Sequence, residues 1–288
     1  MNGIVIVDKP QDWTSQDVTA RLRRVFNTRR IGHGGTLDPM ATGVLPVFVG
    51  RATRAVEFFE HADKVYEATL QLGVITDTED ITGSVLEERP VCISESDLLT
   101  VLGQFRGEIQ QVPPMYSAIK VNGQKLYDLA RQGKEVERKS RTITIHELEL
   151  LEFAGVAAKL RVHCSKGTYI RTLCKDIGEA LGCGGCMAAL RRTAAGNYPI
   201  EKAVKLETLL ETENPEQYLL PVDSIFSGYP EVVLTEKQAL RCRNGNSFSI
   251  GLNDGTYRAY DKTGEFLMLA KVEGGIMSTI KSFFEPSP

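Results

Sequence analysis

One acidic side chain in this sequence is placed for chemistry by its neighbours. Asp38 lies on a glycine-rich turn, GHGGTLDPMATGVLPVFVG from Gly32 to Gly50, directly ahead of an apolar strand. Gly34 and Gly35 allow backbone conformations that other residues avoid, and Pro39 favours an extended Asp38. A carboxylate held on such a loop can act as a nucleophile or a general base. The alternative is a structural turn in which the Asp bonds its own backbone.

The turn lacks the residues that the common catalytic and phosphate-binding loops require. A P-loop has Gly-Lys-Ser/Thr opening a helix, and a Rossmann turn has GxGxxG after a strand; neither occurs here. The serine-hydrolase motif GxSxG is absent from the chain. Because no Ser, Cys or Lys stands beside a base in this stretch, Asp38 is itself the candidate for the chemistry.

Two other segments resemble metal sites but lack essential ligands. The stretch Thr76 to Gly83, TDTEDITG, has the acidic spacing of a calcium loop, but Ile81 and Thr82 stand where a ligand and a glycine are needed. Cys183 and Cys186 form a CxxC, whereas a zinc site needs four ligands and no second close pair follows. We therefore predict no metal, and we expect the two cysteines to be packing residues.

Composition places the chain among soluble proteins of the cytoplasm. It has 288 residues, 42% of them hydrophobic, and a net charge of −3. We expect no membrane segment, because no run of 18 apolar residues occurs, and no charged-then-apolar leader opens the sequence. Six scattered cysteines are too few for a disulfide scaffold in a chain of this length.

The charges are segregated along the chain. Leu206 to Glu236 holds seven acids and no Lys or Arg, so the remainder carries a net positive charge. Ala20 to Gly34 has five Arg and no acid, and Met115 to Arg141 has seven Lys or Arg against three acids. Two basic segments on a mildly acidic protein are typical of a polyanion bound along one face.

A predicted helix supplies a partner for the carboxylate. Lys166-Gly167-Thr168 opens a helix that Gly182 closes, and Tyr169 and Arg171 lie in its first turn. A cation at that end opposes the helix dipole at a cost of several tenths of a kcal/mol. A nearby carboxylate would offset this cost, and we expect that carboxylate to be Asp38.

The remaining elements form an alternation of strands and helices around this site. Strands are predicted at Gly3 to Val7, Val44 to Val49, Lys64 to Gly73, Gln104 to Gln111, Thr142 to Phe153, Ala157 to Ser165, and after Leu190-Arg191-Arg192-Thr193. Helices are predicted from Thr14 or Ser15 to Phe26, and at Ala52 to His61, Ser94 to Leu102 and Lys125 to Gln132. An acidic linker runs to about Tyr229. A long polar excursion at about 113–141 is predicted to be a basic arm.

Several segments together resemble one known family. In chain order they are DKPQDWTS, GHGGTLDPMATGVLPV, KVYEATLQLG with TDTEDITG, PPMYSAIKVNGQKLYDLARQG and CSKGTYIRTLCKDIG. These motifs resemble those of bacterial tRNA pseudouridine synthases of the TruB type, which isomerise uridine 55 in the T loop of tRNA. The likeness covers nearly the whole chain. Asp12 stands where the first motif of the family usually has glycine.

The resemblance implies a fold and a domain plan. It implies an α+β pseudouridine synthase fold with a mixed, largely antiparallel sheet flanked by helices. Residues 1–229 would form the catalytic domain, and 230–288 a small β-rich domain like the PUA fold that binds RNA. The reaction adds no atoms and changes no oxidation state, so no cofactor is expected.

The resemblance also implies roles for individual residues. Asp38 would be the catalytic acid, paired with Arg171, and Tyr66 would stack on the target base, although a strand Tyr is more often a core residue. Tyr169 would complete the pocket. The resemblance also implies four further substrate-binding residues. His33 would fill the gap left by the flipped base, Leu190 would lie in the pocket wall, and Lys9 and Lys120 would also bind the substrate.

The implied partner is tRNA, bound through its T arm by a monomer that requires no protein partner. Two alternatives stay open. The first is an RNA-guided relative of the archaeal and eukaryotic type, which shares the core. The second is a non-catalytic RNA chaperone that only folds tRNA. Whether Asp38 attacks the sugar carbon or removes the 2′ proton is also open.

Overall fold

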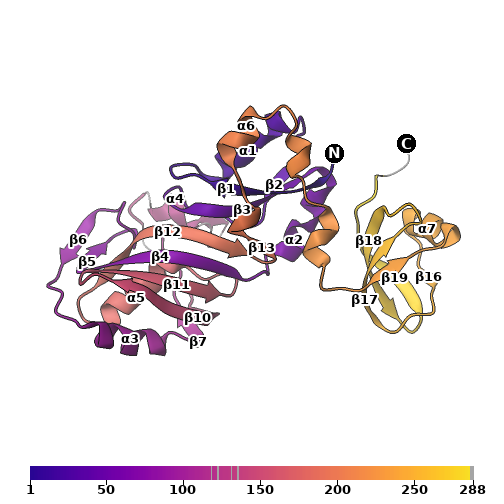
Figure 1. Ribbon diagram of the computed structural model, residues 1–288. Coiled ribbons are helices and arrows are strands. Elements are labelled where there is room, and N and C mark those ends of the chain that lie inside the picture. The colour runs from indigo at the N-terminus through magenta and orange to yellow at the C-terminus, as the bar shows by residue number, and fades with distance from the viewer. Residues whose placement is uncertain (118, 122, 131, 135, 286–288) are drawn as a thin grey trace.

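Two β-sheets, one large and one small, organise the chain (Figure 1). The structure is a computed structural model, and it describes residues 1–117, 119–121, 123–130, 132–134 and 136–285. The large sheet has ten strands and the C-terminal sheet has five. A mixed, largely antiparallel sheet flanked by helices, followed by a small β-rich unit, confirms the predicted fold class.

The large sheet has the order β14-β1-β3-β12-β4-β11-β10-β7, and the short strands β2 and β13 pair at the side. Its described pairs are antiparallel except β1 with β14 and β3 with β12, which are parallel. The strands are β1 (Gly3–Lys9), β2 (Ile31–His33), β3 (Thr42–Val49), β4 (Lys64–Leu72), β7 (Gly107–Gln111), β10 (Arg141–Phe153), β11 (Ala157–Cys164), β12 (Gly185–Ala195), β13 (Tyr198–Pro199) and β14 (Val204–Lys205).

Strand β12 lies at the centre of the sheet, and one sequence prediction about it was wrong. Leu190-Arg191-Arg192-Thr193 was expected to precede a strand, but these residues lie inside β12, between β3 and β4. Two adjacent arginines read as a surface segment. They are accommodated here because Asp8 binds Arg191 with both carboxylate oxygens, at 2.9 and 3.1 Å, while backbone carbonyls accept from Arg192.

Four helices share one hydrophobic core with the large sheet: α1 (Ser15–Val25), α3 (Glu95–Gln104), α5 (Ile170–Ala180) and α6 (Leu206–Glu211). Thr14 and Asp17 close a capping box at the start of α1, as the sequence predicted. The predicted acidic linker is not an open linker. Leu206 and Leu209 of α6 are buried in this core, and the 3-10 helices η3 (Pro215–Tyr218) and η4 (Val222–Phe226) follow.

A second hydrophobic cluster joins the large unit to the C-terminal unit. The predicted helix at 52–61 is a 3-10 helix, η1 (Gly50–Ala55), followed by α2 (Val56–Phe59). The Phe226 ring lies 5.3 Å from the Phe58 ring and 5.8 Å from the Phe283 ring, measured between centroids. Since Phe283 belongs to the C-terminal unit, the two units pack against each other through aromatic side chains.

The C-terminal sheet has the order β15-β17-β18-β19-β16. Its strands are β15 (Glu231–Val233), β16 (Phe248–Ser249), β17 (Gly255–Tyr260), β18 (Phe266–Glu273) and β19 (Ile276–Ser282), and α7 (Glu236–Arg243) packs beside them. The remaining short elements are the hairpin β5 (Val74–Thr76) and β6 (Val85–Glu88), and η2 (Ile200–Lys202). The domain boundary at 229/230 stays a prediction.

The predicted basic arm contains a small hairpin and a short helix. They are β8 (Lys120–Val121), β9 (Gln124–Lys125) and α4 (Leu126–Ala130). Leu126 and Leu129 of α4 are buried, as the sequence pattern predicted. Residues 118, 122, 131 and 135 of the arm lie outside the described residues. Among the helices that are described, none is both long and apolar enough to cross a membrane.

Candidate active site

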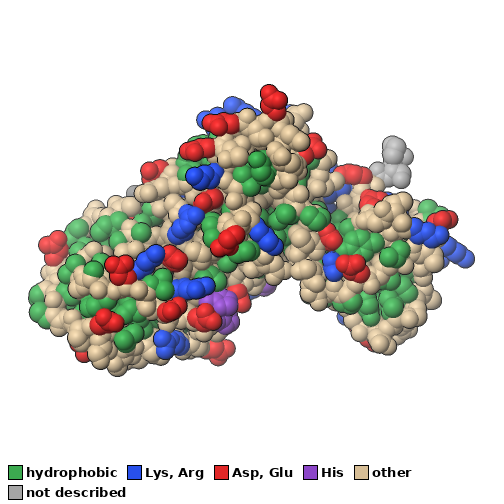
Figure 2. Space-filling model, viewed as in Figure 1, with side chains coloured by type: hydrophobic (Ala, Val, Ile, Leu, Met, Phe, Trp, Pro, Cys, Tyr) green, Lys and Arg blue, Asp and Glu red, His purple; other side chains and the backbone are tan. Residues whose placement is uncertain are grey.

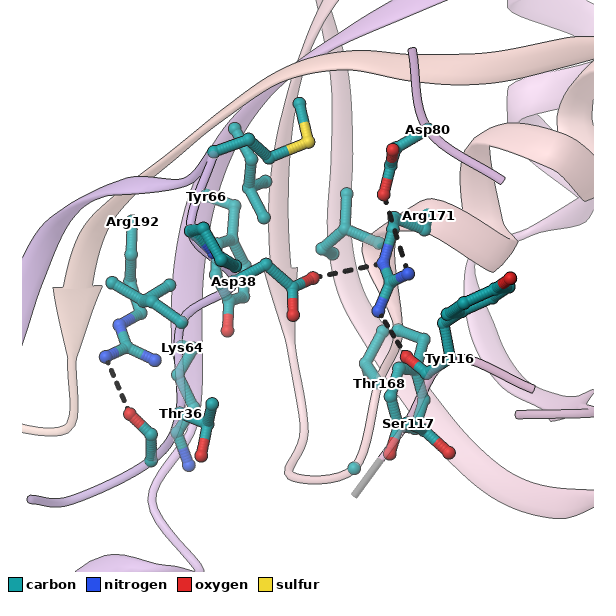
Figure 3. A pocket seen from close by; sticks show the side chains of 18 of the residues that line it. Thr36, Asp38, Lys64, Tyr66, Asp80, Tyr116, Ser117, Thr168, Arg171 and Arg192 are labelled. Carbon is teal, nitrogen blue, oxygen red and sulfur yellow. Dashed lines mark hydrogen bonds and ion pairs between the residues drawn. The ribbon is translucent and has the colours of Figure 1, made fainter. Parts of the chain in front are cut away.

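A cavity of about 840 Å³ opens between the Asp38 loop, β4, β12 and the start of α5. Its volume is within the range of small-molecule pockets. Five of the predicted site residues line it: Asp38, Tyr66, Tyr169, Arg171 and Leu190. Figure 3 shows the Asp38 carboxylate between Tyr66 and Arg171, pointing toward the guanidinium. Residues from four separate parts of the chain therefore meet in one pocket.

The Asp38 loop is held in place by the segment before α1. Ser15 Oγ accepts from the backbone N–H of Leu37 at 2.9 Å and lies 3.2 Å from the Leu37 carbonyl, to which it donates. The backbone N–H of Asp12 donates to the carbonyl of Pro39 at 2.8 Å. The first sequence motif thus fixes the backbone on both sides of Asp38.

Asp12 has a left-handed backbone conformation, with φ of +65°. Most L-residues avoid this region, whereas glycine adopts it freely and Asp tolerates it better than most others. The family's usual glycine and the Asp12 of this chain therefore suit the same turn. The substitution leaves the loop's hydrogen bond to Pro39 in place.

Lys9, to which the resemblance gave a substrate-binding role, does not line the cavity. Its side chain is 0% exposed, and its ammonium group donates to the carbonyls of Pro10, Trp13 and Pro39 at 2.9, 2.6 and 3.2 Å. Burial lowers the pKa of Lys9 to about 8, against the opposing charge of Asp38. The three donated hydrogen bonds join the loop of Pro10 and Trp13 to the Asp38 loop.

Two glycines next to the catalytic loop meet strict steric demands. A Cβ on Gly34 would lie 2.5 Å from the ring of Phe59, so a side chain there would displace a core residue. Gly35 has φ of +101°, which an L-residue rarely adopts. These constraints agree with the shaped loop predicted from the sequence.

Arg171 binds Asp38, as predicted. The Nε atom of Arg171 lies 3.0 Å from Oδ2 of Asp38. The other carboxylate oxygen, Oδ1, accepts no hydrogen bond from the residues that the structure describes. Arg171 is only 6% exposed, whereas the Asp38 side chain is 38% exposed. One oxygen is therefore held while the other is available to a substrate.

Three further acceptors fix the Arg171 guanidinium. Nη1 lies 3.1 Å from the carbonyl of Thr78 and 3.5 Å from Oδ2 of Asp80, and Nη2 donates to the carbonyl of Tyr116 at 2.8 Å (Figure 3). Each nitrogen of the planar fork thus has an acceptor, and this geometry is specific to arginine. The direction of the Asp38 carboxylate is set by a side chain that cannot itself turn.

Asp80 is a site residue that the sequence analysis missed. It is 5% exposed, and its Oδ1 accepts from the Thr78 hydroxyl and from the backbone and hydroxyl of Thr82, at 2.9, 3.0 and 2.5 Å. The segment TDTEDITG was compared with a calcium loop and is one of the motifs of the resemblance, but Asp80 was given no role. The available signal was an acidic residue within a turn rich in Thr, which can hold a carboxylate by hydrogen bonds.

Tyr66 and Leu190 form apolar parts of the wall. Tyr66 lies on β4 opposite Arg192 of β12 and is 9% exposed. Burial raises the pKa of its hydroxyl, so the ring stays neutral. Arg192 donates to the carbonyls of Val44 and Gly35 at 2.6 and 3.1 Å, which links β12 to the catalytic loop. The sequence analysis had not assigned this link.

Lys64 is a buried lysine in the cavity wall. Its ammonium group donates to the carbonyls of Glu60 and Ala62 at 3.3 and 2.5 Å. Burial, and then the charge of Arg192, lower the pKa of Lys64 to about 8. This side chain closes the turn before β4 and contributes an amine to the cavity wall.

Tyr169 is positioned by Gln111, which is another residue that the sequence analysis missed. The Gln111 side-chain amide donates to the carbonyl of Tyr169 at 3.0 Å and accepts from its backbone N–H at 2.8 Å. Gln111 is 2% exposed at the end of β7. The pair of bonds fixes the residue that directly precedes α5 and Arg171.

His33 is not brought into contact with Asp38, and the side chain of Lys120 lies outside what the structure describes. His33 is half-buried on β2, with Nε2 at 3.2 Å from the Gln16 amide nitrogen, and burial lowers its pKa. It does not line the cavity described above. The backbone of Lys120 forms β8, but its side chain lies outside the described residues.

The arrangement suits attack or proton removal by a carboxylate in a partly enclosed pocket. An oriented Asp38 oxygen faces a cavity whose wall includes an aromatic ring and an aliphatic side chain. Burial of the arginine strengthens its electrostatic effect on the carboxylate. Cys183 and Cys186 are both buried away from this chemistry and are free thiols.

Comparisons with known proteins agree on one family. Residues 23–170 match the model of the TruB family pseudouridylate synthase N-terminal domain, and residues 171–227 match that of the tRNA pseudouridylate synthase B C-terminal domain. A tRNA pseudouridine synthase B from Clostridium kluyveri is 44% identical, over 93% of this chain and 94% of the relative. The Francisella tularensis subsp. novicida protein of the same name is 45% identical, over 99% and 95%.

Solved structures show the same architecture. A chain of a Cbf5-Nop10-Gar1 complex aligns with a TM-score of 0.75 and 28% identity, covering 98% of this chain and 85% of that one. A chain of an H/ACA RNP bound to a substrate RNA containing 2′-deoxyuridine aligns with a TM-score of 0.74 and 25% identity, covering 99% and 86%.

Proposed function

This chain belongs to the TruB family of pseudouridylate synthases, and on that premise we propose that it isomerises uridine 55 in the T arm of tRNA to pseudouridine. It is an isomerase of the tRNA pseudouridine synthase class. The single observation that carries the proposal is the 3.0 Å ion pair between Asp38 and Arg171, at a cavity lined by Tyr66. A binding module would not need an oriented carboxylate there.

The reaction rearranges bonds within one nucleotide. The bond from ribose carbon 1′ to uracil nitrogen 1 breaks, the base turns, and carbon 5 joins the sugar. Carbon 5 then loses its proton and nitrogen 1 gains one. Asp38 either attacks carbon 1′, as in retaining glycosidases, or removes the 2′ proton to give a glycal. Its Oδ1, which accepts no hydrogen bond from the residues that the structure describes, suits both routes.

The other residues keep the base in place between cleavage and rejoining. Tyr66 offers a ring for stacking, which contributes about 1 to 3 kcal/mol per base. This offsets part of the few kcal/mol needed to flip the uridine out of its stack. Leu190 and Tyr169 exclude water, so the cleaved base does not leave the pocket.

The partner of the pocket is the T arm, bound by a monomer without a protein partner in the cytoplasm. The exposed cations Lys134, Lys139 and Arg141 support a basic arm that contacts phosphates. Residues 230–288 would add an RNA-binding surface of the PUA type. The aromatic packing around Phe226 supports a fixed placement of this unit relative to the pocket.

Tritium release provides the decisive test. Purified protein is incubated with a tRNA transcript that carries tritium at carbon 5 of its uridines, without added protein or guide RNA. We expect one tritium per tRNA to enter the solvent. A transcript with cytidine at position 55 serves as the control and should release none.

The two alternatives predict different results. A non-catalytic chaperone would bind the transcript without tritium release. An RNA-guided relative would release tritium only when guide RNA and partner proteins are added. Release from the control transcript would overturn the assignment of position 55 while leaving the reaction class intact.

A further inference from the structure

We propose that Asp63, His146 and His163 form a binding site for a divalent transition metal, with Zn²⁺ as the best match. One ligand atom from each of the three side chains lies within 4.8 Å of the others. His146 Nε2 lies 3.3 Å from Oδ2 of Asp63, and His163 Nε2 lies 3.9 Å from the same oxygen. The site is separate from the proposed uridine chemistry.

The distances suit a tetrahedral ion after small side-chain movements. Zinc bonds of about 2.0–2.2 Å in a tetrahedron separate the ligand atoms by about 3.3–3.6 Å. The shortest pair, from His146 to Asp63, already meets this separation. The pair of His163 and Asp63, at 3.9 Å, needs to close by about 0.3–0.6 Å, and the two imidazole nitrogens, which lie within 4.8 Å, by up to about 1.5 Å. Partly exposed side chains achieve this by rotation. The His146, His163 and Asp63 side chains are 37%, 34% and 47% exposed.

The backbone turns His146 toward the other two residues. Ile145 of β10 pairs with Cys164 of β11 and Glu147 pairs with His163, so His146 is the extra residue of a β-bulge. Bulges re-aim side chains and occur at functional positions. The two imidazole rings lie with centroids 4.8 Å apart. This local irregularity has no role in the uridine pocket.

Asp63 is fixed by its own backbone. Its carbonyl accepts from the N–H of Gly196 at 2.9 Å, so the turn before β4 is joined to the end of β12. The carboxylate therefore stands at a defined point beside β10 and β11. The metal would connect the start of β4, the end of β11 and the interior of β10, in addition to the hydrogen bonds between these strands.

The donor set selects the class of metal. Two imidazoles and one carboxylate suit Zn²⁺ and its borderline neighbours, whereas Ca²⁺ and Mg²⁺ prefer oxygen ligands. Three protein ligands leave a fourth position for water. Figure 2 shows histidine side chains gathered at one place on the surface, beside acidic side chains, so solvent reaches the cluster.

The chain offers a matched control. It contains four histidines: His33 lies at β2, and His61 lies two residues before Asp63 with its Nδ1 at 2.5 Å from the Lys166 ammonium nitrogen. His61→Ala removes one exposed imidazole of the same neighbourhood without touching the cluster. His146→Ala and His163→Ala each remove one proposed ligand.

Zinc chloride alone is titrated into the metal-free full chain by calorimetry. We expect one Zn²⁺ per wild-type chain, a higher melting temperature with Zn²⁺, and an affinity reduced by at least about 10–100-fold in either ligand variant. His61→Ala should bind as wild type. Equal melting temperatures of the metal-free variants would show that the lost affinity does not reflect misfolding.

Cobalt substitution reports the ligands directly. Co²⁺ bound at this site should give the intense visible bands of tetrahedral coordination without a thiolate charge-transfer band. A thiolate charge-transfer band would assign the ion to a cysteine such as the exposed Cys92 and would overturn the proposal. Unchanged Zn²⁺ affinity in a His146→Ala/His163→Ala double variant would also overturn it, leaving a hydrogen-bonded His–Asp cluster only.

Discussion

The Nε atom of Arg171 lies 3.0 Å from Oδ2 of Asp38, and this contact fixes the carboxylate while its second oxygen faces the cavity. The arginine is buried at the start of α5, where a cation opposes the helix dipole. Two carboxylates and two carbonyls satisfy it there. The relationship makes the proposed chemistry testable residue by residue.

Asp38→Asn should remove turnover while tRNA affinity stays within a few fold of wild type. The amide keeps the size of the side chain but is neither a nucleophile nor a base. Single-turnover tritium release and filter binding measure the two properties separately. A variant that releases tritium near the wild-type rate would exclude Asp38 as the reacting group.

Arg171→Lys should slow turnover by about 10²-fold, because lysine keeps the charge but loses the planar fork, and small misplacements of a reacting group are costly. Arg171→Leu should also lower the free energy of unfolding by about 3 kcal/mol, since it leaves Asp80 buried without its cation. Single-turnover rates and urea unfolding measure these effects. Near-normal rates in both variants would contradict the positioning role.

Asp80→Asn should lower turnover by about 10- to 100-fold with little change in tRNA affinity. The amide oxygen can still accept from Thr78 and Thr82, but the charge that helps to hold Arg171 is lost. Asp77→Asn is the control, because Asp77 is an exposed acid of the same turn. Equal rates in the two variants would mean that Asp80 only shapes the turn.

Lys9 should make the free energy of unfolding change with pH in the alkaline range. Burial lowers the pKa of Lys9 from its ordinary value of 10.5 to about 8 in the folded protein. Between pH 8 and 10.5 the unfolded chain therefore binds more protons, so this residue makes the free energy of unfolding rise with pH.

Urea unfolding at about pH 7.5 and about pH 9.5 tests whether the free energy of unfolding rises with pH because of Lys9. The difference in unfolding free energy between wild type and Lys9→Met should grow toward the higher pH. Lys205→Met, which removes an exposed lysine on the neighbouring strand, should show no such change. A pH-independent difference for Lys9→Met would contradict the buried, charged amine.

The basic arm should contribute salt-dependent affinity. Replacing Lys134, Lys139 and Arg141 by Ala should flatten the slope of log affinity against log salt by about 0.7 to 0.9 for each lost phosphate contact. Arg138 is left intact, because it donates to the carbonyl of Pro113 at 3.2 Å. Lys202→Ala with Lys205→Ala is the control, and an unchanged slope in the arm variant would show that its charges only face solvent.

Sequence alone identified those site residues whose conformation or charge depends on their immediate neighbours in the chain. The glycine-rich turn pointed to Asp38, because backbone freedom and Pro39 act on adjacent residues. The helix start at Ile170 pointed to a carboxylate partner for Arg171, because the dipole acts within one turn. Most strand and helix positions also followed from the periodicity of hydrophobic residues and from helix-capping residues, with errors of a few residues at the ends of the elements.

Only the tertiary structure decided which polar groups are buried together. Gln111 and Arg192 carry no local signal, because each acts through a hydrogen bond to a segment far away in the chain. Asp80 has a local signal in its Thr-rich turn, but its ion pair with Arg171 depends on the fold. Lys9 reads as a surface cation until three carbonyls enclose it. Strand order and register set these contacts, and they depend on packing of the whole sheet rather than on the sequence of any one strand.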